Sequence, residues 1–319
     1  MVDLYPPTSP YDSGFLDPGD GNRIYYEQLG NPEGKPAVSV HGGPGAGTPA
    51  RPLRAWDPER YRVIRFDQRN CRRSTPHASD PAADMSLNTT WHLIDDMERL
   101  REHLGIGKWL VTGASWGATL ALAYAQQHPE RVTEMIIPAV TMTRPSETYW
   151  LYEGAGRFYP EAWDRFRDGL PEHERDGDLL AAYARLMENP DRAVREKAAA
   201  SWLASEDAVI SNEPNGTPGA YSNREVDAQI AFVRICAHFF SNGAWLEEDQ
   251  LLYNVHKLAG IPAVLVHGRH DMGSPVQTAW ELAKAWPDAQ LHIIEDSGHA
   301  GSDTLAQTVR TAIEEFKDN

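Results

Sequence analysis

Short runs of apolar residues recur along the chain, and turn residues such as Gly and Pro bound most of them. Runs of three to six residues are too short for helices and are typical of buried strands. The pattern therefore predicts strands at residues 23–28, 37–40, 61–66, 109–112, 135–137, 263–268 and 291–294.

Two segments between these runs have a helical period instead. From Asn88 to Leu104, apolar residues recur at intervals of three and four, which predicts an amphipathic helix that ends at Gly105. A second helix is expected over residues 118–128. Because strands and helices alternate, the sequence predicts the α/β class, with a mostly parallel central sheet and helices on both faces.

The alternation stops between residues 141 and 253. This segment is rich in Ala, Glu and Arg, contains four Trp residues, and has a mostly helical pattern. A helical insertion within an α/β protein is the simplest interpretation. We therefore expect a core formed by residues 1–140 and 254–319, and an inserted helical cap, residues 141–253, for substrate recognition.

The amino-acid composition is that of a globular protein and argues against several classes of partner. Hydrophobic residues make up 41% of the 319 residues, enough for a large core, and the formal net charge is -16. An acidic chain lacks the concentrated positive field that nucleic-acid binding needs, so no nucleic-acid partner is expected. The two cysteines predict neither a disulfide framework nor a zinc site. Since no signal-peptide pattern and no apolar stretch of about 18 residues is present, we expect a cytoplasmic protein with no membrane partner.

The segment Gly113-Ala114-Ser115-Trp116-Gly117 matches the pattern G-x-S-x-G between a predicted strand and a predicted helix. In this motif a serine on a strained turn is the nucleophile, and the flanking glycines let the strand and the helix approach each other. The pattern alone is weak. Its position between strand and helix favours Ser115 as a catalytic nucleophile over a chance match in a turn.

A serine nucleophile needs a histidine base and an acid that orients the base. In folds with this turn, the three residues follow in the order serine, acid, histidine. Asp271 and His299 fit that order, and each follows a predicted strand. Alternatives that fit less well are Asp296 as the acid and His41, His267 or His270 as the base.

The segment His41-Gly42-Gly43-Pro44-Gly45 follows a predicted strand and is typical of a loop that supplies an oxyanion-hole donor. We expect the backbone N–H groups of Gly43 and Trp116 to stabilise the oxyanion. The sequence has no phosphate-binding loop and no metal motif such as H-E-x-x-H. We therefore expect catalysis without a metal or a cofactor.

Motifs along nearly the whole chain resemble those of the proline iminopeptidases (prolyl aminopeptidases), which are α/β-hydrolases with a helical cap. The matching segments begin at Tyr5, Asp20, His41, Phe66, Ser74, Asn88, Gly113, Trp150, Val266 and Ser297. The resemblance implies the α/β-hydrolase fold and a serine mechanism that releases an N-terminal residue, typically proline, without a metal or cofactor.

The resemblance also implies a substrate pocket, formed by Glu206, Cys236, Thr141, Trp150 and Phe239. In the family, acidic side chains of the cap bind the free amine of the substrate, and Glu206 matches one of them. The second falls at Cys236, a neutral thiol, and an aromatic residue of the family's proline pocket falls at Thr141. Further departures are Asn70 and Arg72, where the family prefers Gly, and Ser274, where it has Cys.

These observations predict a serine hydrolase that removes an N-terminal proline or a similar residue from a small peptide, amide or ester through an acyl-enzyme. An alternative is a related amidase, esterase or acyl transferase with a rebuilt acyl pocket that acts on a specialised-metabolite substrate. A catalytically silent binding protein is a third possibility, against which the complete set of Ser115, Asp271 and His299 argues.

Overall fold

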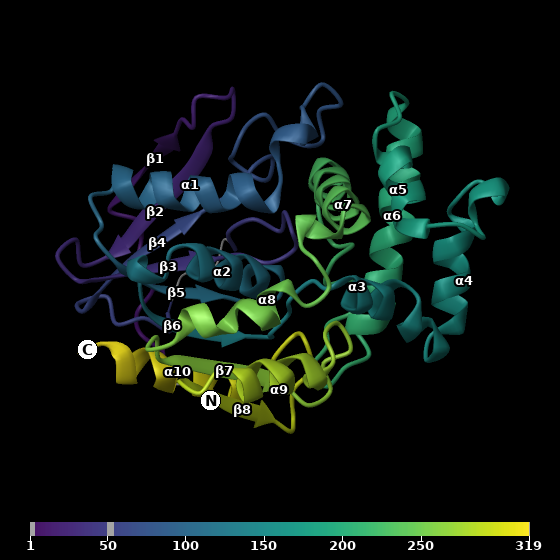
Figure 1. The fold of residues 1–319 in the computed structure, drawn as a ribbon. Helices are drawn as coiled ribbons and strands as arrows, with labels where there is room; N and C mark the ends of the chain where they lie inside the picture. The colour runs from purple at the N-terminus through teal and green to yellow at the C-terminus, as the bar shows by residue number, and fades with distance from the viewer. Residues whose placement is uncertain (1–3, 50–53, 319) are drawn as a thin grey trace.

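A computed structural model describes residues 4–49 and 54–318, and its strands form one sheet in the order β1-β2-β4-β3-β5-β6-β7-β8 (Figure 1). Neighbouring strands from β4 to β8 are parallel, whereas β2 pairs antiparallel with both β1 and β4. The predicted, mostly parallel sheet is therefore confirmed. The strands are β1 (Asp12–Leu16), β2 (Ile24–Gly30), β3 (Lys35–Val40), β4 (Tyr61–Phe66), β5 (Trp109–Gly113), β6 (Val132–Pro138), β7 (Ala263–Gly268) and β8 (Ala289–Ile294).

Helices cover both faces of the sheet, because alternate residues of the central strands are buried on opposite sides. In β5, Trp109 and Val111 pack on one side and Leu110 packs on the other. α10 (Asp303–Phe316) covers the side of Leu110. The opposite side carries α1 (Thr90–His103), α2 (Trp116–Gln127), α8 (Gln250–Tyr253) and α9 (Val276–Ala285).

Most of the remaining helices lie together beside one end of the sheet (Figure 1). They pack on one another around a buried aromatic cluster that includes Phe166, Tyr183 and Trp202. The chain then returns to the core cluster through Leu246 and Leu251. These helices are α3 (Pro145–Tyr152), α4 (Pro160–Asp168), α5 (Leu179–Met187), α6 (Arg192–Ile210) and α7 (Val226–Ser241).

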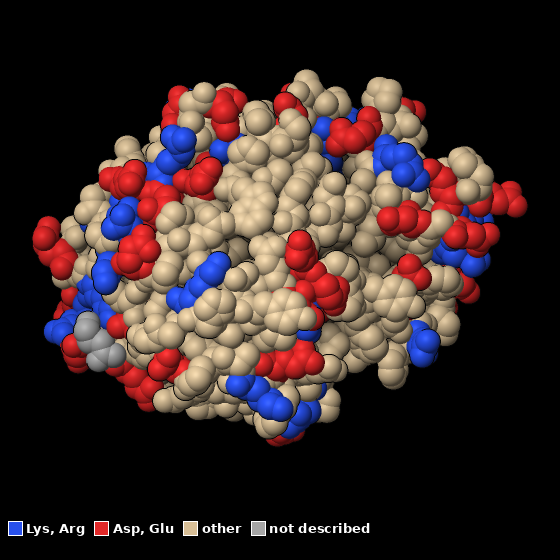
Figure 2. Space-filling model, in the orientation of Figure 1, with Lys and Arg blue, Asp and Glu red and all other residues tan. Residues whose placement is uncertain are grey.

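On the face shown in Figure 2, acidic and basic side chains are interspersed. Several surface charges form ion pairs, such as Arg185 with Glu174 and Arg269 with Glu295. Exposed pairs of this kind contribute on the order of 0–1 kcal/mol each, so the apolar clusters provide most of the stabilisation. Among the helices of residues 4–49 and 54–318, none is long and apolar enough to cross a membrane.

Candidate active site

Ser115 lies in the turn between β5 and α2, with a φ of 57°, which residues other than glycine rarely adopt. The strand and the helix on either side of it meet too closely for larger side chains. A Cβ on Gly113 would lie 2.2 Å from the carbonyl oxygen of Gly117, and a Cβ on Gly117 would lie 2.3 Å from that of Val40. The strained turn therefore needs both glycines of the G-x-S-x-G pattern.

The structure brings Ser115, His299 and Asp271 together. His299 Nε2 lies 3.1 Å from Ser115 Oγ, and His299 Nδ1 lies 2.9 and 3.0 Å from the two carboxylate oxygens of Asp271. At these distances the imidazole can accept the serine proton while the buried carboxylate fixes its orientation. Asp296, the alternative acid, instead accepts hydrogen bonds from Ser302 and Thr304.

The charges around His299 set its pKa. Burial alone would lower that pKa, but the carboxylates of Asp271, Glu213 and Glu206 outweigh burial and raise it to about 9. Burial likewise opposes ionisation of Asp271, yet His299 lowers the pKa of this carboxyl below its usual value. The pair thus favours the imidazolium at neutral pH, and the basic imidazole forms as the pH rises.

Gly43 and Trp116 line the same cavity as Ser115 and His299. Trp116 is the first residue of α2, so its N–H has no partner in the preceding turn of the helix. Within residues 4–49 and 54–318, the N–H of Gly43 donates to no backbone carbonyl. Two N–H groups with these properties beside a nucleophile can bind an oxyanion.

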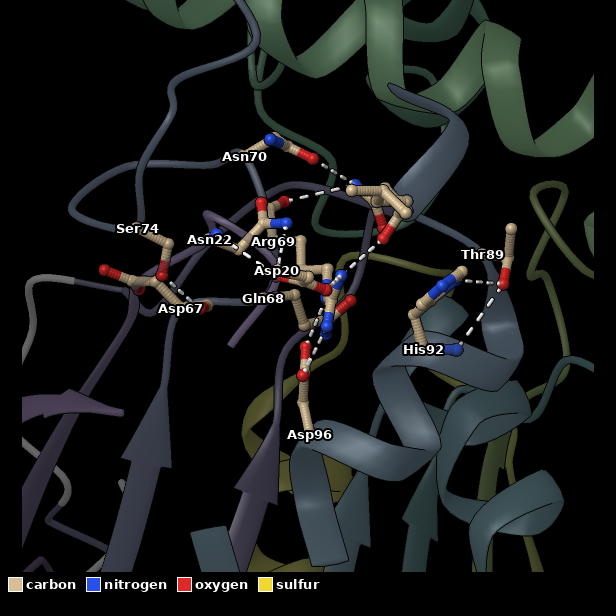
Figure 3. Close-up of polar contacts among 12 residues, drawn as sticks. Asp20, Asn22, Asp67, Gln68, Arg69, Asn70, Ser74, Thr89, His92 and Asp96 are labelled. Carbon is tan, nitrogen blue, oxygen red and sulfur yellow. Dashed lines mark hydrogen bonds and ion pairs between the residues drawn. The ribbon is translucent and has the colours of Figure 1, made fainter. Parts of the chain in front are cut away.

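The loop after β4 supports both of these segments. The side-chain amide of Gln68 donates to the carbonyl oxygen of His41 at 2.8 Å, and its Oε1 accepts the indole N–H of Trp116 at 2.9 Å. The next residue, Arg69, is buried and donates two hydrogen bonds to Asp96, each 2.7 Å, and one to Asp20 at 2.6 Å (Figure 3). This ion-pair network fixes the loop that holds the candidate oxyanion donors.

A cavity of about 70 Å³ opens at the candidate nucleophile. Besides the residues named above, the walls are formed by Thr141, Thr143, Glu147, Thr148, Leu151, Tyr152, Glu206, Ile210, Tyr221, Phe232, Phe240 and Gly273.

Two carboxylates line this cavity. Glu206 Oε1 accepts the hydroxyl of Tyr152 at 2.6 Å and the indole N–H of Trp202 at 2.7 Å. Its Oε2 has no hydrogen-bond partner among the described residues, and burial raises the pKa of Glu206. Glu147, by contrast, is already paired with Arg144 at 3.0 Å. Glu206 is therefore the carboxylate that retains a free oxygen for a ligand.

Thr141 also lines the cavity, and its hydroxyl donates to the carbonyl oxygen of Ser115 at 2.7 Å. Cys236 is buried close to Glu206 but is not among the described residues that form the cavity wall. Its thiol donates to the carbonyl oxygen of Pro44 at 3.3 Å. The thiol thus supports the loop after β3, whereas Thr141 supports the turn that carries Ser115.

Trp150 and Phe239 are likewise absent from the described part of the cavity wall. The indole N–H of Trp150 donates to the carbonyl oxygen of Met272 at 2.8 Å. The ring of Phe239 packs edge-on against Trp116, with 4.9 Å between the ring centroids. Both aromatic side chains therefore contact neighbours of the triad.

Tyr221 and Glu213 are among the residues of this site that the sequence did not predict. Tyr221 lines the cavity, and its hydroxyl makes no hydrogen bond to another described residue. Glu213 accepts hydrogen bonds from the loops of both Asp271 and His299. No local motif marks either residue, because both lie in the irregular segment between α6 and α7. The described ranges contain no group of three or more His, Cys, Asp and Glu residues arranged to hold a metal ion.

Known proteins share this architecture. A family model described as the alpha/beta hydrolase fold matches residues 36–304. The chain is 44% identical to a probable proline iminopeptidase of Streptomyces coelicolor, over 99% of this chain and 98% of the relative. It is 46% identical to a proline iminopeptidase of Xylella fastidiosa, over 94% of each chain.

Among solved structures, the proline iminopeptidase of Mycobacterium smegmatis is similar, with a TM-score of 0.60 and 19% identity. The similarity covers 96% of this chain and 99% of that one, and at this identity it supports the fold alone. The two sequence relatives also support the family assignment, because each is more than 40% identical to this chain over almost the full length of both proteins. The chain belongs to the proline iminopeptidase family of α/β hydrolases.

Proposed function

We propose that this enzyme removes the N-terminal residue, with proline preferred, from small peptides and amides. Besides the relatives' names, one observation supports the proposal. Glu206 lines the small cavity that opens at Ser115, and both hydrogen bonds that it accepts from described side chains go to Oε1. A carboxylate binds the cationic amine of an unblocked N-terminus by a charge-assisted hydrogen bond. A cavity of this small size favours a compact first residue, such as proline, over a bulky one.

The proposed mechanism proceeds through an acyl-enzyme. Ser115 Oγ attacks the carbonyl carbon of the first residue while His299 Nε2 takes the hydroxyl proton. The bond to the leaving nitrogen breaks as His299 gives this proton to the nitrogen, which leaves an ester on Ser115. Water then attacks the ester, His299 takes a proton from the water and returns it to Ser115, and the amino acid is released.

Asp271 and the oxyanion donors assist both halves of this reaction. Asp271 holds the Nδ1–H side of His299, so that Nε2 faces the serine. The N–H groups of Gly43 and Trp116 stabilise the oxyanion of each tetrahedral intermediate. The loss of one such donor typically costs about 2.7–4 kcal/mol of transition-state stabilisation.

We further infer that residues 141–253 act as the cap, while residues 1–140 and 254–319 carry the triad and the oxyanion loop. The cap would supply Glu206, Tyr152 and Phe232 to the cavity. Its helices share a buried aromatic cluster of their own, which supports this division. A cytoplasmic location agrees with the two cysteines, which are both buried and free.

A second candidate function is hydrolysis or transfer of a small acyl group from a substrate that has no free amine. The thiol of Cys236 favours this function, because it supplies no charge at the position where the family resemblance implies a second carboxylate. Arg224 also lies near Glu206, and its positive charge offsets part of the burial effect on the pKa of that carboxyl. Because Glu147 is paired with Arg144, only Glu206 remains for an ammonium, and the guanidinium of Arg224 lies nearby. Such a site attracts an ammonium less strongly than a site with two unpaired carboxylates.

The test compares wild type, Ser115→Ala and the control Ser86→Ala, which alters an exposed serine. We expect wild type and the control to hydrolyse prolyl arylamide and to react with a fluorophosphonate. Ser115→Ala should lose both activities and keep its melting temperature, because alanine fits where serine does. Arylamide hydrolysis by Ser115→Ala within tenfold of wild type would contradict the proposal.

A further inference from the structure

A third carboxylate reaches the triad from the segment between α6 and α7. Glu213 is buried, and both of its oxygens are hydrogen-bonded. Oε1 accepts the backbone N–H of Met272, the residue after Asp271, and Oε2 accepts the backbone N–H of His299 itself. One side chain thus joins the loop of the acid to the loop of the base.

The packing around this carboxylate is close. A Cβ on Gly298 would lie 2.4 Å from Glu213 Oε2 and 2.6 Å from Glu213 Cβ, so only glycine fits beside it. Two residues further along the chain, the side-chain amide of Asn215 donates to the carbonyl oxygen of Asp296 at 2.8 Å. The segment that carries Glu213 is therefore joined to the His299 loop at two points.

We propose that Glu213 is a positioning residue that aligns Asp271 with His299 and places a negative charge beside the imidazole. The proposal deepens the proposed function, since it rests on the same triad. The carboxylates that act on His299 come from three places: Asp271 after β7, Glu213 after α6, and Glu206 within α6. Glu213 in turn faces Asp271, His299 and the hydroxyl of Tyr159.

Glu213 changes its charge near neutral pH. Burial, and then the charge of Asp271, raise the pKa of Glu213 to about 7. Above this pH the carboxylate holds both backbone N–H groups strongly, because charged acceptors form the stronger hydrogen bonds. Below it, the protonated acid binds them less well, and the negative charge beside His299 disappears. The alignment of the triad is thus coupled to pH.

The rate at which a fluorophosphonate labels Ser115, measured against pH, tests the proposal without reference to the natural substrate. In this reaction the serine oxygen bonds to phosphorus, fluoride leaves, and His299 takes the hydroxyl proton. We expect Glu213→Gln to lower the limiting rate at high pH by roughly 10- to 150-fold, the usual effect of losing a charged hydrogen bond. The midpoint of the rise with pH should also move to lower pH, because one anion beside His299 is removed.

Two further variants distinguish the effect of the charge of Glu213 from the effect of its side-chain length. Glu213→Asp keeps the charge but is one methylene group shorter, so the rate should fall while the midpoint stays near that of wild type. Glu295→Gln removes the same charge four residues before His299, from a side chain that is 70% exposed. Solvent screens that charge, so neither the rate nor the midpoint should change.

The results distinguish this proposal from the proposed function. A lower rate in Glu213→Gln with an unchanged midpoint indicates a merely structural role and overturns the proposal, as does a rate within twofold of wild type. If Glu213→Gln does not fold, Glu213→Asp tests the alignment of the triad. A rate equal to that of wild type contradicts the proposal, and a lower rate with an unchanged midpoint and an unchanged melting temperature supports it. Wild-type protein that is not labelled at all refutes the proposed function instead.

Discussion

At the scale of single residues, the charged neighbours of His299 determine the pKa of its imidazole. Three carboxylates from different parts of the chain act on it, and together they outweigh the effect of burial. The protonated imidazole is the form that these anions stabilise, and it is also the form that cannot accept the serine proton. The pH dependence of the enzyme therefore reports directly on this arrangement.

We expect the rate to rise with pH, with a midpoint above 6.5, the ordinary pKa of histidine, and towards 9. The sign follows from the neighbouring anions: they raise the pKa of His299, so a higher pH is needed to release its proton. The measurement is kcat/KM against pH for a small ester whose own groups do not titrate. A midpoint at or below 6.5 would show that the carboxylates do not act on the base.

A second prediction concerns Glu206, which we expect to bind the amine of the substrate. In Glu206→Gln the amine of the substrate loses a charged hydrogen bond, which should lower kcat/KM for prolyl arylamide by roughly 10- to 150-fold. A small ester without an amine should be hydrolysed as before at a pH above the midpoint, where His299 is unprotonated with or without the charge of Glu206. Glu161→Gln, which alters an exposed glutamate of α4, serves as the matched control. Equal values of kcat/KM for Glu206→Gln and wild type on the arylamide would mean that the amine is bound elsewhere.

At the scale of elements, the apolar runs predicted the buried strands well, because both faces of the sheet are covered. β4 and β7 have the predicted bounds. β1 was not predicted, since its residues Asp12–Leu16 form an edge strand that is mostly exposed and has no apolar run. The helix after Ser115 begins at Trp116, two residues before the predicted start, because the turn leads directly into it.

In the site, too, some residues could be predicted from the sequence and others could not. Ser115, Asp271 and His299 were identified from chain order, because each follows a strand whose carboxyl end lies at the same edge of the sheet. Glu213 was not identified, because its partners Met272 and His299 lie 59 and 86 residues away and only tertiary packing joins them.

The orientation of α7 was also hidden from sequence reasoning. It directs Phe232 and Phe240 into the cavity and Phe239 onto Trp116. The resemblance to the family matched Phe239 to a pocket residue, but the packing of α7 determines which of its side chains line the cavity.

The loop after β4 provides a test at the scale of elements. Asp96 neutralises the buried guanidinium of Arg69, so Asp96→Ala should lower the free energy of unfolding by about 3–5 kcal/mol, because it leaves a buried charge with reduced compensation. The measurement is equilibrium unfolding in urea.

The control for this test is Glu295→Ala, which breaks the exposed pair with Arg269 and should cost no more than about 1 kcal/mol. A loss of stability in Asp96→Ala no larger than in this control would mean that the network does not stabilise the loop.

At the scale of the whole molecule, the cavity joins two parts of the chain. Ser115, Gly43 and His299 come from the α/β core, whereas Glu206 and Phe232 come from the helices beside the sheet. Glu213 adds a direct link, because a residue of the segment 141–253 contacts both triad loops. We therefore expect substrate recognition and triad alignment to depend on the same segment.

The central claim is that the enzyme recognises an unblocked N-terminal proline. The most direct measurement is kcat/KM of wild-type protein for prolyl arylamide and for the same arylamide with its amine acetylated. Because one charged hydrogen bond distinguishes the two substrates, we expect the free amine to be preferred by roughly 10- to 150-fold. Equal or faster cleavage of the acetylated substrate would contradict the account.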